Sequence, residues 1–113
     1  MDKNRWIGKV IPLADSIAYS SDAVVSKTLL NSKAGTLTLF AFDQGQGLSE
    51  HTAPFDATVQ ILDGEAEIRI DQTTHKVHPG QMLIMPAGIP HELKAEKPFK
   101  MLLIMIRERK EPA

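Results

Sequence analysis

Short runs of apolar and β-branched residues recur along this chain, separated by glycine, proline, asparagine or aspartate. Runs of this length and spacing are typical of an antiparallel sandwich or barrel, and no stretch keeps a helical period for three turns. The pattern therefore predicts an all-β fold. The expected strands cover residues 24–30, 36–42, 58–62, 65–70, 82–85 and 101–106.

One pair of these runs carries a hairpin signal. Asp63-Gly64 lies between the runs 59–62 and 65–70, and Asp-Gly between strand-like segments is strongly favoured in two-residue β-turns. The sequence therefore predicts a tight hairpin at this position. In the second run Ala66, Ile68 and Ile70 alternate with charged residues, which predicts one buried and one solvated face.

In other segments apolar and polar residues do not alternate. Residues 83–85 and 102–106 are apolar on both faces, so we expect cover on both sides, part of it from another subunit. Residues 1–22 hold apolar residues without a regular period and are predicted to form an arm that packs on the barrel or on a partner. The barrel itself is expected over residues 23–107, with a frayed charged tail at 108–113.

Composition limits the class of protein. A chain of 113 residues suits one domain. Its 13 basic and 14 acidic residues give no reason to expect nucleic acid or an anionic membrane as partner, so a small-molecule ligand is favoured. Cysteine is absent, which excludes disulfides and thiolate ligands. The longest apolar run, 101–106, is too short to span a bilayer, and without a secretory signal we expect a cytoplasmic protein.

A glycine, a proline, a second glycine and a histidine follow one another at fixed intervals in the second half of the chain. They are Gly80, Pro86, Gly88 and His91. This spacing resembles the second motif of the cupins at all four positions. The resemblance implies a cupin-type double-stranded β-helix, the RmlC-like jelly-roll barrel, in a single domain.

The first cupin motif is present in outline upstream. Gly45, His51 and Gly64 stand at the spacing that the family leads us to expect, so the resemblance covers about residues 35–106. Two motifs in the right order and separation make it specific, although this first motif is degenerate at its ligand positions.

The resemblance also implies a metal site, built in the family from two histidines and a glutamate of the first motif and one histidine of the second. In this chain those positions are His51, Ala53, Ala57 and His91, so two of the four ligands are missing. Such a set suits iron, manganese, nickel or zinc, and here we expect at most a weak, incomplete site on His51 and His91. Asp56, one residue before Ala57, would reach the site only through a bulge.

Three functions follow from this reading. The first is binding of a small molecule in a pocket lined by His51, Ala53, Ala57 and His91, with a divalent metal held weakly if at all. The second is a metal-dependent cupin enzyme, an oxygenase or isomerase. The third is a metal-free acid–base enzyme similar to the sugar epimerases, with His51 and His91 as candidate catalytic residues. The resemblance further implies a homodimer formed through a sheet face and the N-terminal arm.

Overall fold

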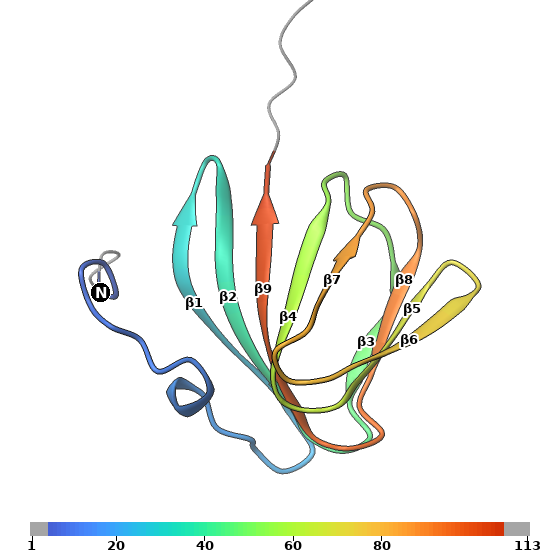
Figure 1. Ribbon diagram of the computed structural model, residues 1–113, viewed down its shortest axis with the longest axis horizontal. Helices are drawn as coiled ribbons and strands as arrows, with labels where there is room; N and C mark the ends of the chain where they lie inside the picture. The colour runs from blue at the N-terminus through green and yellow to red at the C-terminus, as the bar shows by residue number, and fades with distance from the viewer. Residues whose placement is uncertain (1–4, 108–113) are drawn as a thin grey trace, which may run out of the picture.

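The computed structural model describes residues 5–107, and over this range the chain folds into nine strands and one short 3₁₀ helix (Figure 1). The all-β prediction is confirmed. The elements are η1 (Ala14–Ser16), β1 (Val24–Ser32), β2 (Gly35–Phe42), β3 (Gly47–His51), β4 (Ala57–Gly64), β5 (Ala66–Ile70), β6 (Thr73–Val77), β7 (Met82–Met85), β8 (His91–Lys94) and β9 (Phe99–Ile106).

The strands form two sheets. A five-stranded sheet has the order β1-β2-β9-β4-β7, and a four-stranded sheet has the order β3-β8-β5-β6. All neighbouring strands are antiparallel. From β3 to β9 the chain passes repeatedly from one sheet to the other, and Figure 1 shows the five-stranded sheet on the left and the four-stranded sheet on the right. This crossing is the connectivity of a jelly roll.

The prediction of a hairpin at Asp63-Gly64 is wrong. β4 pairs with β7 and β9, whereas β5 pairs with β6 and β8, so the two strands that flank Gly64 belong to different sheets. Gly64 has φ of 75°, and a Cβ there would lie 2.1 Å from the carbonyl oxygen of Pro98. The glycine therefore lets the chain cross from one sheet to the other close to the start of β9. Local turn chemistry does not distinguish such a crossover from a hairpin.

Three strands were not predicted, namely β3, β6 and β8. They are four or five residues long, and they are mainly polar: β6 reads Thr-Thr-His-Lys-Val and β8 reads His-Glu-Leu-Lys. All three belong to the four-stranded sheet, whose outer face is solvated. Their short runs therefore lack the apolar signal by which the other strands were recognised.

The core lies between the two sheets. Ala66 and Ile68 are fully buried, in agreement with the predicted alternation. Phe42 and Phe99 stack there with their ring centroids 4.5 Å apart. His91 belongs to the same interior and is only 2% exposed, the one polar residue among the buried side chains of residues 5–107.

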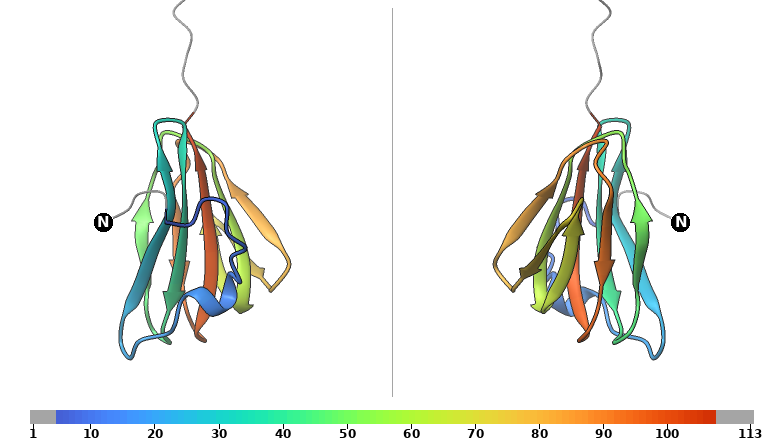
Figure 2. Two further views of the ribbon diagram at one scale, coloured as in Figure 1. Left: turned by 90° about the vertical axis from the view of Figure 1, so that its left-hand side faces the viewer. Right: turned by 90° about the vertical axis from the view of Figure 1, so that its right-hand side faces the viewer.

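Part of the N-terminal segment packs on the outer face of the five-stranded sheet. A second cluster of apolar side chains contains Trp6, Ile11, Leu13 and Ile17 of this segment together with Leu29, Leu39, Ala41 and Leu102 of the sheet. Lys27 and Lys100 donate hydrogen bonds to the carbonyl oxygens of Ser16 and Ala14. Figure 2 shows the segment crossing in front of the sheet. We call the part of it described by the structure, residues 5–22, the arm.

The predicted boundaries at 22 and 107 stay predictions, and the tail at 108–113 lies outside the described residues. Within residues 5–107 no helix is both long enough and apolar enough to pass through a membrane.

Candidate functional site

His91 is placed by the turn that precedes it. Gly88 adopts φ of 74° in the loop between β7 and β8, and His91 is the first residue of β8. In the sheet register His91 stands between His51 of β3 and Ile70 of β5. Because side chains alternate along a strand, His91 and Leu93 point into the barrel, whereas Glu92 points outward.

His51 approaches from the neighbouring strand. It is the last residue of β3, it lies after an irregularity in the pairing with β8, and its side chain is exposed. Its Nδ1 lies 2.7 Å from the carbonyl oxygen of Ser49. Since a carbonyl can only accept, Nδ1 carries the proton and donates. In neutral His51 the other nitrogen, Nε2, is therefore an acceptor.

The two imidazoles meet at the end of the barrel. The Nε2 atoms of His51 and His91 are 3.0 Å apart, and the rings are nearly perpendicular at a centroid distance of 4.3 Å. With His51 Nε2 as the acceptor, His91 Nε2 must donate. The contact is therefore a directed N–H···N hydrogen bond from the buried ring to the exposed one.

This assignment leaves the other nitrogen of His91 with a lone pair. His91 Nδ1 is buried and has no hydrogen-bond partner among the described residues. A buried polar atom without a partner is costly to folding and marks a functional-site candidate. Burial lowers the pKa of His91, and the neighbouring His51 lowers it further. The Ile89 backbone acts in the opposite direction but has the smallest effect of the three, because it makes no hydrogen bond of full geometry with the ring. His91 is thus held neutral at pH 7.

Two loops hold this end of the barrel together. The amide of Gly88 donates to the carbonyl oxygen of Ala53 over 2.8 Å, and the amide of Ala87 donates to Asp56 Oδ1 over 2.8 Å. Asp56 therefore fastens the loop before His91 to the loop after His51 through its Oδ1. Sequence reasoning missed this role, because it depends on a contact between residues 31 positions apart.

The two alanines at the family's other ligand positions lie in a loop and in the other sheet. Ala53 is half-buried in the loop between β3 and β4, and Ala57 is a buried core residue at the start of β4, in the opposite sheet from His91. Among residues 5–107 no three histidine, aspartate or glutamate side chains form a metal-binding group. The residues present therefore do not fit the four-ligand metal site of the resemblance.

The carboxylates nearest in sequence to the histidines face away from them. Arg69 lies 2.9 Å from Glu50 and 3.8 Å from Glu92 on the outer side of the four-stranded sheet. The hydrogen bond that Arg69 donates to Glu50 raises the pKa of Arg69. These acids are thus engaged with an arginine and are not paired with an imidazole.

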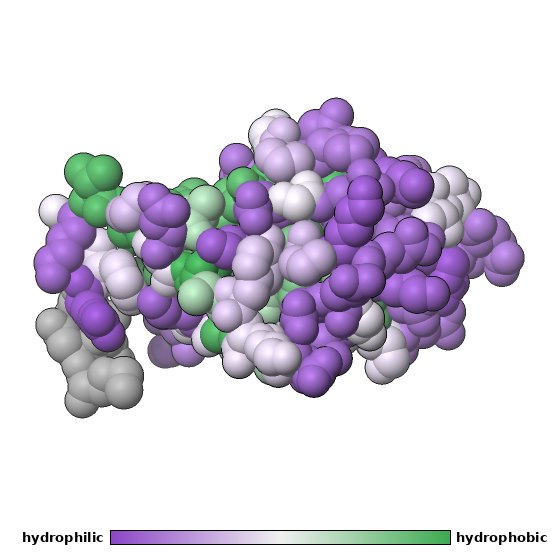
Figure 3. All heavy atoms as spheres, turned by 90° about the horizontal axis from the view of Figure 1, so that it is seen from below, coloured by the Kyte–Doolittle hydropathy of each residue, from purple (hydrophilic) through white to green (hydrophobic). Residues whose placement is uncertain are grey.

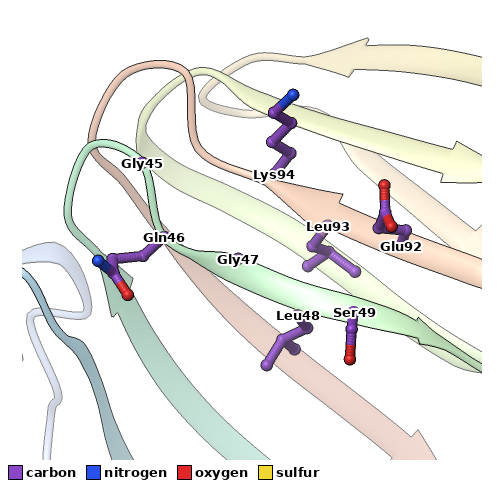
Figure 4. Close-up of a pocket in the computed structure, with 8 residues that line it drawn as sticks. All are labelled: Gly45, Gln46, Gly47, Leu48, Ser49, Glu92, Leu93 and Lys94. Carbon is purple, nitrogen blue, oxygen red and sulfur yellow. The ribbon is translucent and has the colours of Figure 1, made fainter.

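A shallow polar hollow lies at the other end of β3 and β8. It has a volume of about 330 Å³ and is lined by Gly45–Ser49 and Glu92–Lys94. Figure 4 shows Glu92 and Lys94 on one side of β8 and Leu93 on the other. Glu92 already lies near Arg69, and neither histidine lines this hollow. The His51–His91 pair is therefore the stronger candidate site.

Comparison with known proteins agrees with this architecture. The family model described as the cupin domain matches residues 38–106. A conserved protein of unknown function from Streptococcus pyogenes is 40% identical, with 97% of this chain and 98% of that chain covered and a TM-score of 0.87. A cupin superfamily protein from Desulfitobacterium hafniense is 32% identical, covering 94% and 97%, with a TM-score of 0.85.

A cupin 2 conserved barrel domain protein from Leptotrichia buccalis is 38% identical. The match covers 86% of this chain and 47% of that one, with a TM-score of 0.83. The comparison with curated proteins finds no match. The two motifs of glycines and a histidine, the two facing antiparallel sheets and these matches agree, and the chain belongs to the cupin domain family.

Proposed function

We propose that this cupin binds a small hydroxylated molecule at the His51–His91 pair, with one hydroxyl group of the ligand placed between the two Nε2 atoms. The observation that carries the proposal is the directed hydrogen bond between the rings, in which His91 Nε2 donates and His51 Nε2 accepts. A hydroxyl is both donor and acceptor. It can accept from His91 and donate to His51 without any change of protonation state or tautomer.

Binding of this kind replaces one hydrogen bond by two. The rings move apart, which ends a contact of roughly 1 kcal/mol, and the ligand hydroxyl then bonds to both of them. His51 is exposed and fixed through Nδ1 to the Ser49 carbonyl, so it is the ring that the ligand meets first. His91 is buried and neutral, which makes it a donor of fixed direction.

In this proposal Ala53 and Ala57 leave the ligand site without the further polar groups of the family pattern. Their methyl groups take the positions where the family resemblance leads us to expect a histidine and a glutamate, so they add neither charge nor a further hydrogen-bonding group. At the family's ligand positions, polar recognition of the ligand then depends on the two imidazoles alone, a sparse arrangement that is common in small-molecule sites.

The experiment is an NMR titration of ¹⁵N-labelled protein with a panel of monosaccharides and short polyols, following the imidazole nitrogens. A binding member should shift the Nε2 signals of both His51 and His91 and leave His51 Nδ1 protonated. The variants His51→Ala and His91→Ala should each lose the effect, whereas the control His78→Ala, which removes an exposed histidine beside Glu65, should keep it. The proposal fails if no member of the panel shifts either ring, or if binding survives loss of both histidines.

A second candidate function is weak binding of a divalent metal ion. Two nitrogen ligands at about 2.1 Å from a metal and at right angles to each other are about 3.0 Å apart, which is the observed Nε2 separation. The hydrogen bond from His51 Nδ1 to a backbone carbonyl is also the usual support of a metal-bound histidine. Iron, nickel and zinc suit such nitrogen ligands, whereas manganese prefers oxygen ligands. Two ligands from the protein would hold the ion weakly.

The two enzymatic alternatives have less support. An oxygenase or isomerase would need the two missing ligands, and an epimerase-like mechanism would need an acid or base beside the imidazoles, whereas Glu50 and Glu92 face Arg69. A substrate that is turned over would separate these functions from binding, because His91→Ala would then abolish the reaction.

A further inference from the structure

The two sheets of the barrel differ in width, so one strand has no strand opposite it. When the orders β2-β9-β4-β7 and β3-β8-β5-β6 are laid face to face, the two strands of every facing pair are consecutive in the sequence. Each pair is joined by a short connection at the lower end of the barrel in Figure 1, at residues 43–46, 95–98, 65 and 78–81. β2 therefore faces β3, and β1 lies beyond the edge of the smaller sheet.

The two ends of the barrel also differ. Figure 3 views the lower end, where the connections form an unbroken surface that is hydrophilic on the side away from the arm. Toward the upper end the strands spread apart (Figure 1), and there β3 ends at His51 and β8 begins at His91. The inner side chains of β1 and β2 at this upper end thus belong to the wall that faces His51.

This part of the inner face is polar. Leu37 of β2 belongs to the outer apolar cluster and Phe40 belongs to the interior, so Thr36 and Thr38 point inward by alternation. The register of β1 and β2 places two further polar residues directly opposite these threonines, on the same face. The resulting polar wall consists of Thr28, Asn31, Thr36 and Thr38.

The polar wall differs from the neighbouring inner face in size as well as polarity. On β9, Met105 stands beside Thr36 and Leu103 beside Thr38, and both of these larger side chains pack against the core. The two threonines are half-buried, and their small side chains leave space in front of His51. The four residues of the wall carry hydroxyl or amide groups and no charge, which suits an uncharged ligand with several hydroxyl groups.

We propose that the polar wall is the second half of the ligand site and that the ligand is a neutral sugar in its pyranose ring form. This assignment rests on the proposed function, in which one hydroxyl lies between His51 and His91. Further hydroxyls of the ring then bond to the threonine hydroxyls and the Asn31 amide, which both donate and accept. Phe40 is half-buried on the same inner face as Thr38 and supplies an aromatic surface for the C–H groups of the ring.

The dimensions of the site favour a ring over a shorter ligand. Facing sheets lie about 10 Å apart, and alternate residues on one strand are roughly 6.7 Å apart, so a ligand must extend away from the imidazoles to reach Thr36 and Thr38. A pyranose carries hydroxyls on opposite edges of its ring and reaches both walls. A ring with a single hydroxyl satisfies the histidine pair alone.

The experiment removes hydroxyls from the wall and compares two kinds of ring ligand. Thr36→Val and Thr38→Val keep the branched shape of the side chain, and valine is favoured in strands, so both variants should fold. Each should weaken binding of a methyl hexopyranoside (gluco, galacto or manno) by about 2- to 10-fold, and the double variant by more, because each loses one hydrogen bond. Cyclohexanol should bind the parent and the variants equally.

Thr58→Val is the matched control. Thr58 lies on β4 of the same sheet and points outward, since its neighbours Ala57 and Val59 are buried in the core. This variant should leave the affinity for the hexopyranoside unchanged.

NMR of the imidazole nitrogens and the threonine methyl groups follows both halves of the site at once. A bound hexopyranoside should shift His51 and His91 together with Thr36 and Thr38. Shifts confined to the histidines, with unchanged sugar affinity in the valine variants, would overturn the assignment and leave the proposed function standing, as would binding of cyclohexanol or acyclic polyols without any binding of hexopyranosides. If no ligand of either kind shifts the imidazoles, the proposed function is wrong and the assignment with it.

Discussion

The two halves of the candidate site are built from the same kinds of residue and yet are held in different ways. In residues 80–91 the glycines stand in open turns: a Cβ at Gly80 or Gly88 would meet nothing within 4 Å. The histidine that ends this half is buried. In residues 45–64 the opening glycine, Gly45, is equally open, but the closing glycine, Gly64, is pressed against Pro98 and Phe99, and the histidine of this half, His51, is exposed.

The two family motifs therefore have different structural roles. The glycine turn of the second half directs a buried imidazole into the barrel, so this motif determines the geometry of the candidate site. In the first half the closing glycine makes a crossover between the sheets possible, so its position is required by the packing of the two sheets. A chain can therefore keep the cupin barrel while alanines replace two of the family's ligands.

The sharpest test of this contrast compares two glycines of nearly equal φ. Gly64→Ala should destabilise the protein by more than about 3 kcal/mol, because the new Cβ would overlap a backbone carbonyl as well as strain the backbone. Gly88→Ala carries the backbone strain alone and should cost about 1–2 kcal/mol. Urea unfolding of both variants measures the difference, and equal losses would show that φ alone governs both positions.

The two histidines should also differ in how much each contributes to the free energy of unfolding. His91→Ala opens a cavity in the interior and should lower the free energy of unfolding by about 2–3 kcal/mol, whereas His51→Ala, at an exposed position, should lower it by less than about 1 kcal/mol. The measurement is again urea unfolding. A greater loss for His51→Ala would mean that the exposed half holds the site together.

The missing ligands can be restored in the first half. Ala53→His combined with Ala57→Glu should raise the affinity for Ni²⁺ or Zn²⁺ at least 10- to 100-fold over the parent, the size of effect known for groups that merely support a ligand. Calorimetric titration measures it. Because Ala57 is buried, the double variant should be less stable without metal and regain stability with it. A folded double variant with unchanged affinity would show that these residues do not face the histidines.

The smallest expected effect is the pH dependence that His91 contributes. Its pKa in the folded protein is lowered, so the unfolded chain, with a histidine pKa of about 6.5, binds the proton more readily. Stability from this group is therefore complete above about pH 6.5 and decreases as the pH falls below it. The fall in melting temperature from pH 8 to pH 5 should be smaller in His91→Gln than in the parent. Equal falls would contradict the neutral assignment of His91.

The chain's own pattern was sufficient for the barrel, and it predicted the two histidines that the structure brings together. The spacing of Gly80, Pro86, Gly88 and His91 is local and depends on turn conformation, so it can be read without a structure. The alternation in β5 is local in the same way, and the burial of Ala66 and Ile68 agrees with it. Such features depend on residues close together along the backbone, which is why the amino-acid order alone determines them.

Tertiary structure decided how these parts meet. Asp63-Gly64 has the chemistry of a hairpin, but β4 and β5 join different sheets because their partners, β9 and β8, come from later in the chain. The hydrogen bond between His51 and His91 spans 40 residues, and the apolar cluster on the outer face of the five-stranded sheet depends on where the arm lies across that sheet. Each of these contacts forms only after distant segments pack, since the pairing of strands, and hence the environment of each imidazole, is fixed by long-range burial and not by local preference.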